Sequence, residues 1–206
     1  LVENESSLRT RINLRSKLYT IIFFDLWLSP FNYLIIALVS CMGVIISNAT
    51  GMTVQSGVWV IFVWVLLLLA LIDIKTSLLP DLLTLPLMWL GILIQLSPDW
   101  KTVGIEQSIL GVIFAYLPLW IMTKLYFLFR HQHGLGYGDL KLLAAIGAWL
   151  GPSLIPPVLF LASVFALLYR LYIFLVYRRG ARHEPFPFGP WIVIAAVLML
   201  VLFKLG

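Results

Sequence analysis

The chain has 206 residues, of which 62% are hydrophobic and 11% charged, and its mean hydropathy is +1.02. A soluble domain is usually about half apolar and a quarter charged, so the composition excludes an ordinary soluble domain. It predicts an all-α, polytopic membrane protein whose surroundings are the lipid bilayer. The net charge of +5 could suggest nucleic acid, but the placement of the basic residues argues against that partner.

Apolar stretches along the chain predict a helical bundle of about six to seven transmembrane segments, because a spanning helix needs roughly 20 apolar residues. We expect segments near Phe31–Ile46, Gly57–Ile72, Leu82–Leu96, Glu106–Phe129, Leu154–Val176 and Trp191–Phe203, and a partial crossing at Leu140–Leu150. The basic segment 1–30 is expected to lie in the cytoplasm or at the membrane interface. Residues 31–206 are expected to form one membrane-embedded domain.

The basic residues predict the orientation of these segments. If each crossing is real, only Lys101 and Lys204 of the 14 Lys and Arg residues fall on one side of the membrane, and the others fall on the opposite side. Cytoplasmic loops carry the excess of Lys and Arg in membrane proteins. We therefore expect a cytoplasmic N-terminus, and the loops that follow the second segment and precede Leu140 should also face the cytoplasm.

Two acids stand out in these cytoplasmic loops. Asp73 ends the second expected segment, and Asp139 closes the stretch Gly136-Tyr137-Gly138-Asp139. An ionisable group at membrane depth costs about 2.5–3.5 kcal/mol on insertion scales, so acids at the ends of such apolar runs indicate a function. The alternative for Asp73 is a solvated residue at the membrane edge that pairs with Lys75.

Residues near the two acids have local interpretations of their own. Asp81 follows Pro80, where it is expected to cap the next helix by accepting a backbone N–H. Gly136 and Gly138 would let a helix begin close to a neighbour and bring Asp139 within reach of another helix end. A flexible loop is the alternative for this glycine-rich stretch.

His131 and His133 could bind a metal ion. Two histidines without a third ligand are more often surface residues, so we expect no metal site.

Two aspartates that meet at a membrane edge can share one proton, because like charges a few Å apart raise the pKa of one carboxyl while the other stays ionised. The ionised group can act as general base on water, and the protonated group can polarise a peptide carbonyl. This chemistry needs neither a metal ion nor a nucleophilic Ser or Cys. Asp73 and Asp139 are the candidates for such a pair.

Three blocks of sequence together resemble the type IV prepilin peptidases. They appear in the family's order, cover residues 57–206, and are specific only in combination. The blocks are Ala70 to Leu96 with Ile72-Asp73 and Leu79-Pro80-Asp81, then Gly136-Tyr137-Gly138-Asp139 running into Lys141-Leu142-Leu143, then Pro187-Phe188-Gly189-Pro190.

The resemblance implies a membrane aspartic endopeptidase of the Gly-x-Gly-Asp type, with 31–206 as the peptidase domain. It would remove the basic leader from prepilins or pseudopilins at the cytoplasmic face of the bacterial inner membrane. Asp73 and Asp139 would be the catalytic pair. The matching motif residues Asp81, Gly136, Gly138 and Lys141 would support them.

Members of this family with two activities also methylate the new N-terminal residue with S-adenosylmethionine, and they usually carry two cysteine pairs in a cytoplasmic loop near the N-terminus. Residues 1–30 contain no cysteine. We therefore expect proteolysis without a cofactor and weak or absent methylation, with S-adenosylmethionine required only if methylation is retained.

Two other classes remain open. Acids within a membrane also mark proton or ion paths, so a proton- or ion-coupled transporter using the same aspartates is the main alternative. A non-catalytic assembly subunit would explain the topology but would leave the two acids without a task.

Overall fold

The computed structural model describes residues 54–97, 103–130, 136–177 and 187–204. All of them belong to one compact unit, Gly43–Gly206. The regular structure in these ranges is helical, without a strand, which confirms the all-α prediction. The expected first segment at 31–46 and the basic segment 1–30 lie outside the described residues, so the predicted domain boundary between them stays a prediction.

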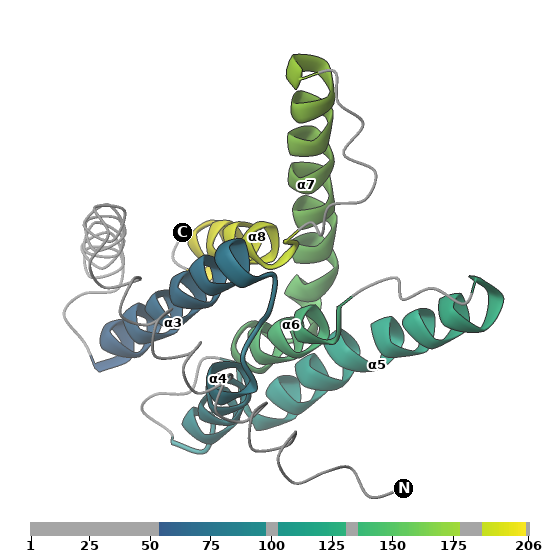
Figure 1. The fold of residues 1–206 in the computed structure, drawn as a ribbon. Coiled ribbons are helices and arrows are strands. Elements are labelled where there is room, and N and C mark those ends of the chain that lie inside the picture. The colour runs from purple at the N-terminus through teal and green to yellow at the C-terminus, as the bar shows by residue number, and fades with distance from the viewer. Residues whose placement is uncertain (1–53, 98–102, 131–135, 178–186, 205–206) are drawn as a thin grey trace, which may run out of the picture. The chain divides into compact units, whose positions relative to one another are not determined.

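The described helices follow the predicted segments closely. They are α3 (Val54–Thr76), α4 (Asp81–Ile94), α5 (Ile105–Arg130), α6 (Tyr137–Leu150), the short 3-10 helix η1 (Pro152–Leu154), α7 (Ile155–Tyr177) and α8 (Gly189–Lys204) (Figure 1). The clearest difference concerns α6, which begins at Tyr137 rather than at Leu140. Asp139 therefore lies inside the first turn of this helix.

Three of these stretches are long and apolar enough to cross a membrane: Ser56–Thr76, Ile105–Arg130 and Pro152–Val176. The helices Asp81–Ile94 and Gly189–Phe203 are apolar but shorter. Large apolar side chains on the long helices are exposed, including Phe129 on α5 and Leu167 on α7. Such surfaces suit lipid rather than water, and the protein is a multi-pass membrane protein.

Helix α6 is the buried element of this unit. From Leu142 to Leu150 every residue is buried, and the helix packs against α4, α5, α7 and α8 (Figure 1). Its closest approach is to α5, where a Cβ added at Gly147 would overlap the backbone carbonyl of Gly111. Small residues at a crossing let two membrane helices approach this closely, and Ser108 Oγ donates a hydrogen bond across it to the Ala148 carbonyl at 2.7 Å.

Trp149 fastens the C-terminal end of α6 to two further helices. Its ring stacks on Phe62 of α3 with centroids 4.5 Å apart, and its Nε1–H donates to the Leu87 carbonyl of α4 at 2.8 Å. Trp149 is 1% exposed, so a large apolar area is buried and its one polar atom is satisfied. Because this end of α6 is fixed, the position of its first turn, which carries Asp139, is constrained as well.

Candidate active site

Asp73 lies on the last turn of α3, close to where the helix ends. Ser77 terminates the helix in a left-handed conformation with φ 51°, and its N–H donates to the Asp73 carbonyl at 2.7 Å. The Thr76 hydroxyl donates to the Ile72 carbonyl at 2.7 Å. This local arrangement places the Asp73 side chain at the end of a membrane-spanning helix, where it is 4% exposed.

The Asp73 carboxylate lies against the start of α8. The N–H of Gly189, the first residue of α8, donates to Asp73 Oδ2 at 2.9 Å. The first N–H groups of a helix have no partner within it, and the positive end of the helix dipole favours a negative charge there. A Cβ at position 189 would stand 2.7 Å from Asp73 Oδ2, so glycine leaves room for the carboxylate.

Asp139 approaches the same region from the first turn of α6. Gly136 is the N-cap residue of this helix, and its carbonyl accepts the Asp139 N–H at 3.1 Å. A Cβ at Gly138 would stand 2.9 Å from the Leu79 Cβ, so α6 begins in close contact with the turn that joins α3 to α4. The predicted close approach is confirmed for Gly138, and the flexible-loop alternative is wrong for residues 137–139, which are helical.

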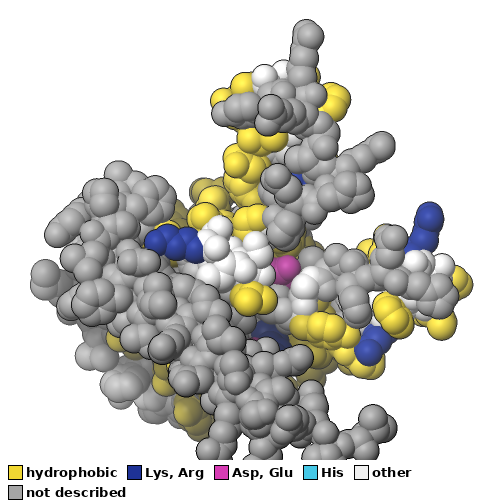
Figure 2. All heavy atoms as spheres, viewed as in Figure 1, with side chains coloured by type: hydrophobic (Ala, Val, Ile, Leu, Met, Phe, Trp, Pro, Cys, Tyr) yellow, Lys and Arg dark blue, Asp and Glu magenta, His cyan; other side chains and the backbone are white. Residues whose placement is uncertain are grey.

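The two carboxyl groups interact electrostatically. Burial, together with the nearby charge of Asp73, raises the pKa of Asp139 from its ordinary 3.8 to about 7. On the face that Figure 2 shows, acidic side-chain atoms are visible as a small spot beside white atoms of the backbone or of uncharged side chains. Near neutral pH, Asp139 therefore exchanges a proton, beside a second carboxyl group.

The prediction that Asp81 caps α4 is wrong. Pro80 occupies the N-cap position with an extended backbone, ψ 130°, and no side chain caps the helix. Asp81 is the first helical residue, and its two carboxylate oxygens accept hydrogen bonds from Lys141 Nζ at 2.6 and 2.8 Å. The ion pair links the start of α4 to the first turn of α6.

The expected alternative for Asp73 was an ion pair with Lys75. No such pair joins these two described residues, and the Asp73 side chain faces Gly189 instead. His131 and His133 lie outside the described residues, so the metal-binding alternative is untested.

Sequence reasoning missed two contacts, one at Asp73 and one at the start of α4. The stretch Pro187-Phe188-Gly189-Pro190 carries part of the family resemblance, but no local pattern in it places the backbone N–H of Gly189 on Asp73. Thr84 is fully buried, and its hydroxyl donates to the Pro80 carbonyl at 3.3 Å. A threonine one turn after a proline is a signal that could have suggested this second contact.

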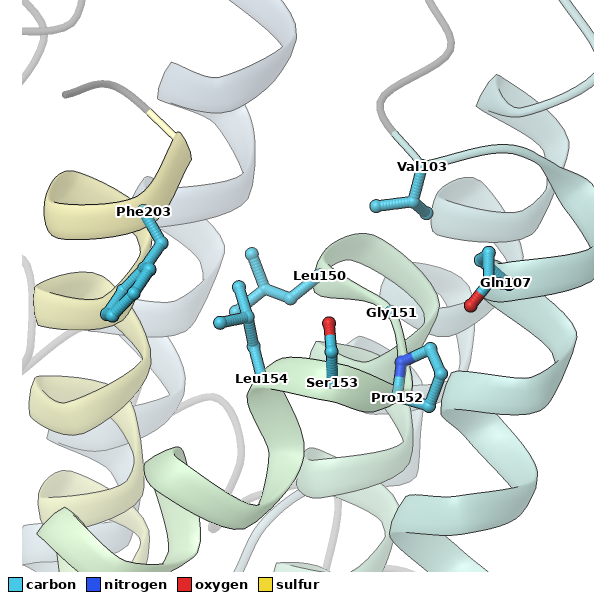
Figure 3. A pocket seen from close by; sticks show the side chains of 8 residues that line it. All are labelled: Val103, Gln107, Leu150, Gly151, Pro152, Ser153, Leu154 and Phe203. Carbon is cyan, nitrogen blue, oxygen red and sulfur yellow. The ribbon is translucent and has the colours of Figure 1, made fainter.

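A pocket of about 440 Å³ lies at the other end of α6 (Figure 3). Its lining is Val103, Gln107, Leu150, Gly151, Pro152, Ser153, Leu154 and Phe203. At 1.5 Å per helical residue, Leu150 is roughly 16 Å along the axis from Asp139. This pocket is therefore separate from the two acids.

Comparison with known proteins identifies the family. Residues 60–171, more than half of the chain, match the type IV leader peptidase family. The chain belongs to this family. The matched range includes both Asp73 and Asp139, and the family membership predicted from the three sequence blocks is confirmed.

Curated relatives carry the name prepilin leader peptidase/N-methyltransferase. The relative from Dichelobacter nodosus is 40% identical over 81% of this chain and 56% of its own length. Those from Aeromonas salmonicida and Pseudomonas aeruginosa are each 37% identical, over 80% and 73% of this chain and 57% and 51% of their own lengths. The chain thus spans about half the length of these relatives. No solved structure matches the chain.

Proposed function

We propose that this membrane protein is an aspartic endopeptidase that removes the leader peptide from type IV prepilins or pseudopilins, with Asp73 and Asp139 as its catalytic residues. One observation carries the proposal. Two acids from different helices, α3 and α6, come close enough for the charge of one to act on the other, and the pKa of Asp139 is raised to about 7.

The geometry suggests a different role for each acid. Asp73 accepts a hydrogen bond from a backbone N–H, and such a bond favours the ionised form of a carboxyl group. Asp73 then acts as general base, taking a proton from water as the water oxygen attacks the peptide carbonyl carbon. Asp139 holds the other proton and donates it to the carbonyl oxygen.

The remaining steps restore both acids. The tetrahedral intermediate collapses, the C–N bond breaks, and the departing nitrogen takes up the proton that Asp73 had received from water. The hydroxyl of the intermediate returns its proton to Asp139 as the new carboxyl group forms. The net reaction is the addition of one water molecule across one peptide bond.

The supporting residues would hold these acids in place. Gly138 allows α6 to begin against the turn at Leu79, Gly136 leaves room for the Asp139 carboxyl group, and the ion pair between Asp81 and Lys141 joins α4 to α6. We propose that these residues determine the distance between the acids rather than touch the substrate.

The substrate and the location are also proposals. The names of the relatives support a prepilin leader as substrate. The excess of basic residues in the loops that carry the acids supports an active site at the cytoplasmic face of the bacterial inner membrane.

Methyl transfer is named for the relatives, and S-adenosylmethionine would be its cofactor. The pocket of Figure 3 is one concave site among the described residues that can be compared with such a cofactor. Its polar side chains are Gln107 and Ser153, and it lies at the end of α6 away from Asp139. This lining carries no charged side chain and lies away from the two acids, so it does not fit a charged cofactor beside the cleavage site, and we assign no methyl-transfer step to it.

Leader release tests the proposal directly. The purified protein, reconstituted in vesicles, is incubated with a prepilin whose leader carries a fluorescent label, and the products are separated by gel and identified by mass spectrometry. We expect a single cut that releases the basic leader. Absence of cleavage across prepilins and pseudopilins from several bacteria would overturn the proposed function.

A transporter using the same acids receives no support from the family match or from the relatives reported above, which are leader peptidases by name. Vesicles loaded with a pH-sensitive dye provide the corresponding check. We expect no proton flux that depends on Asp73 and Asp139.

A further inference from the structure

We infer that the start of α8 is part of the active site, and that Gly189 is a positioning residue whose backbone N–H holds the Asp73 carboxylate in the orientation of a general base. The inference rests on the proposed function and deepens it. It assigns a task to a segment outside the range 60–171 that the family match covers.

The hydrogen bond between Gly189 and Asp73 is short and buried, and it joins two helices. Gly189 N lies 2.9 Å from Asp73 Oδ2, and both residues are buried. The contact joins α3 to α8, two helices that pack against each other, across 116 positions in the sequence. A buried carboxylate is costly unless it is hydrogen-bonded, and this N–H supplies the bond.

Only glycine fits at position 189, because a side chain there would clash with Asp73. A Cβ at position 189 would meet Asp73 Oδ2 at 2.7 Å, Cγ at 3.1 Å and Cβ at 3.3 Å. Any side chain there would push the carboxylate away from the N–H and change its orientation toward Asp139. Pro190 follows directly, and the steric clash of its Cδ with the preceding residue restricts how the backbone of Gly189 could adjust.

The two acids have different surroundings. The charged side chains on the helix ends around this contact include Lys75 on α3 itself, Asp139 and Lys141 on α6, and Asp81 on α4. From 189 to 203, α8 carries no charged residue, and on α7 the ring of Tyr169, which is followed by Arg170, contacts Trp191 near the start of α8. Lys141 and Asp81 pair with each other. The Gly189 N–H donates to Asp73, and a hydrogen bond of this kind stabilises the negative charge of the carboxylate that accepts it.

Matched alanine variants separate this role from a general effect of alanine. Gly189→Ala should lower the kcat of leader release by about ten- to a hundredfold, the range expected for losing a hydrogen bond to a charged group, with KM unchanged. Gly57→Ala is the control, because nothing lies within 4 Å of a Cβ at that position, and it should cleave as the unaltered protein does. Equal kcat values for the two variants would overturn the inference.

A backbone substitution covers the case in which Gly189→Ala fails to fold. Cell-free synthesis with glycolic acid at position 189 replaces the N–H by an oxygen atom and adds no side chain. This variant should also lose about tenfold or more in kcat. In the pH profile of its cleavage rate, the rise on the acidic side should move to higher pH, because the ionised form of Asp73 has lost its hydrogen-bond donor. An unchanged rate and an unchanged pH profile would contradict the inference.

A spectroscopic readout does not depend on cleavage. In protein labelled with ¹⁵N-glycine, the Gly189 amide signal is assigned by its loss in Gly189→Ala. Asp73→Asn should shift this signal strongly, and Asp81→Asn, whose side chain pairs with Lys141, should leave it in place. If the unaltered protein cleaves no prepilin while this pattern holds, the proposed function fails but the contact stands. If Asp73→Asn leaves the signal unmoved, the inference itself fails.

Discussion

The two ends of α6 are held in different ways. At the C-terminal end, Trp149 stacks on Phe62, and Gly147 brings the backbone of α6 against that of α5. At the N-terminal end, Asp139 is half-buried beside Asp73, and an exposed ion pair of Lys141 with Asp81 lies close by. One end is closely packed and apolar, and the other concentrates charge.

This difference indicates how a short helix can hold a reactive acid. Placing a carboxyl group among apolar residues costs free energy of folding, and favourable packing elsewhere in the fold must offset that cost. The packing around Trp149 provides that stability while leaving the acid where its pKa is raised. Local conflicts of this kind are expected at functional sites.

The largest effect is expected on cleavage activity, from substitutions of the two acids at the N-terminal end of α6. Asp73→Asn and Asp139→Asn should each lower leader cleavage by about a thousandfold or more, because one member of a catalytic pair cannot act without the other. Thermal unfolding in detergent should show that both variants remain folded. Cleavage by either variant near the unaltered rate would remove that acid from the catalytic pair.

A substitution at the C-terminal end of α6 should lower the free energy of unfolding. Gly147→Ala places a Cβ against the Gly111 carbonyl, and overpacking of this kind costs about 1–3 kcal/mol. Chemical denaturation of the reconstituted protein measures the loss, and Gly57→Ala again serves as the control. If the two alanine variants prove equally stable, the helix crossing is not the constraint described above.

The pH dependence should report Asp139. Since its pKa is raised to about 7, the protonated form that the mechanism needs is lost above that pH, and cleavage should fall by about tenfold per pH unit there. Folding raises this pKa above its ordinary 3.8. The contribution of Asp139 to stability is therefore most favourable below about pH 4 and declines as the pH rises toward about 7.

Two measurements check this prediction. Cleavage rates across the neutral range should show the loss of activity, and denaturation of Asp139→Asn over the same range should lack that residue's part of the stability change. A rate that is constant up to about pH 9 would contradict a role for protonated Asp139.

The smallest effect is expected from the exposed ion pair. Asp81→Asn and Lys141→Met should each reduce kcat only a few-fold, because exposed pairs contribute about 0–1 kcal/mol. Exchanging the charges in Asp81→Lys with Lys141→Asp should restore much of the rate. A double variant no better than the worse single one would mean that the pair does not position α6.

Much of the described fold could be predicted from apolar runs, because each such run between residues 54 and 204 corresponds to one helix. The start of α6 could not. Gly136 and Gly138 indicate a loop when only local preference is considered, yet Gly138 packs against Leu79, and this tertiary contact stabilises a helix that begins at Tyr137.

The site shows the same limit. Asp73 and Asp139 are conspicuous because they are isolated acids at the ends of apolar runs. The partner of Asp81 could not be found by a local capping rule, since Lys141 is 60 positions away. The role of Gly189 was even harder to predict from the sequence, because its backbone N–H makes the contact and no side-chain pattern encodes it.

The central claim is that Asp73 and Asp139 share one proton near neutral pH and that Asp139 carries it. Infrared difference spectroscopy of the reconstituted protein, titrated from about pH 5 to about pH 9, measures this through the carbonyl stretch of a protonated carboxyl group. We expect one such band to disappear around pH 7, to be absent in Asp139→Asn, and to disappear at lower pH in Asp73→Asn because the neighbouring charge is gone. A band that is lost in Asp73→Asn but unchanged in Asp139→Asn, or no titrating band at all, would contradict the account.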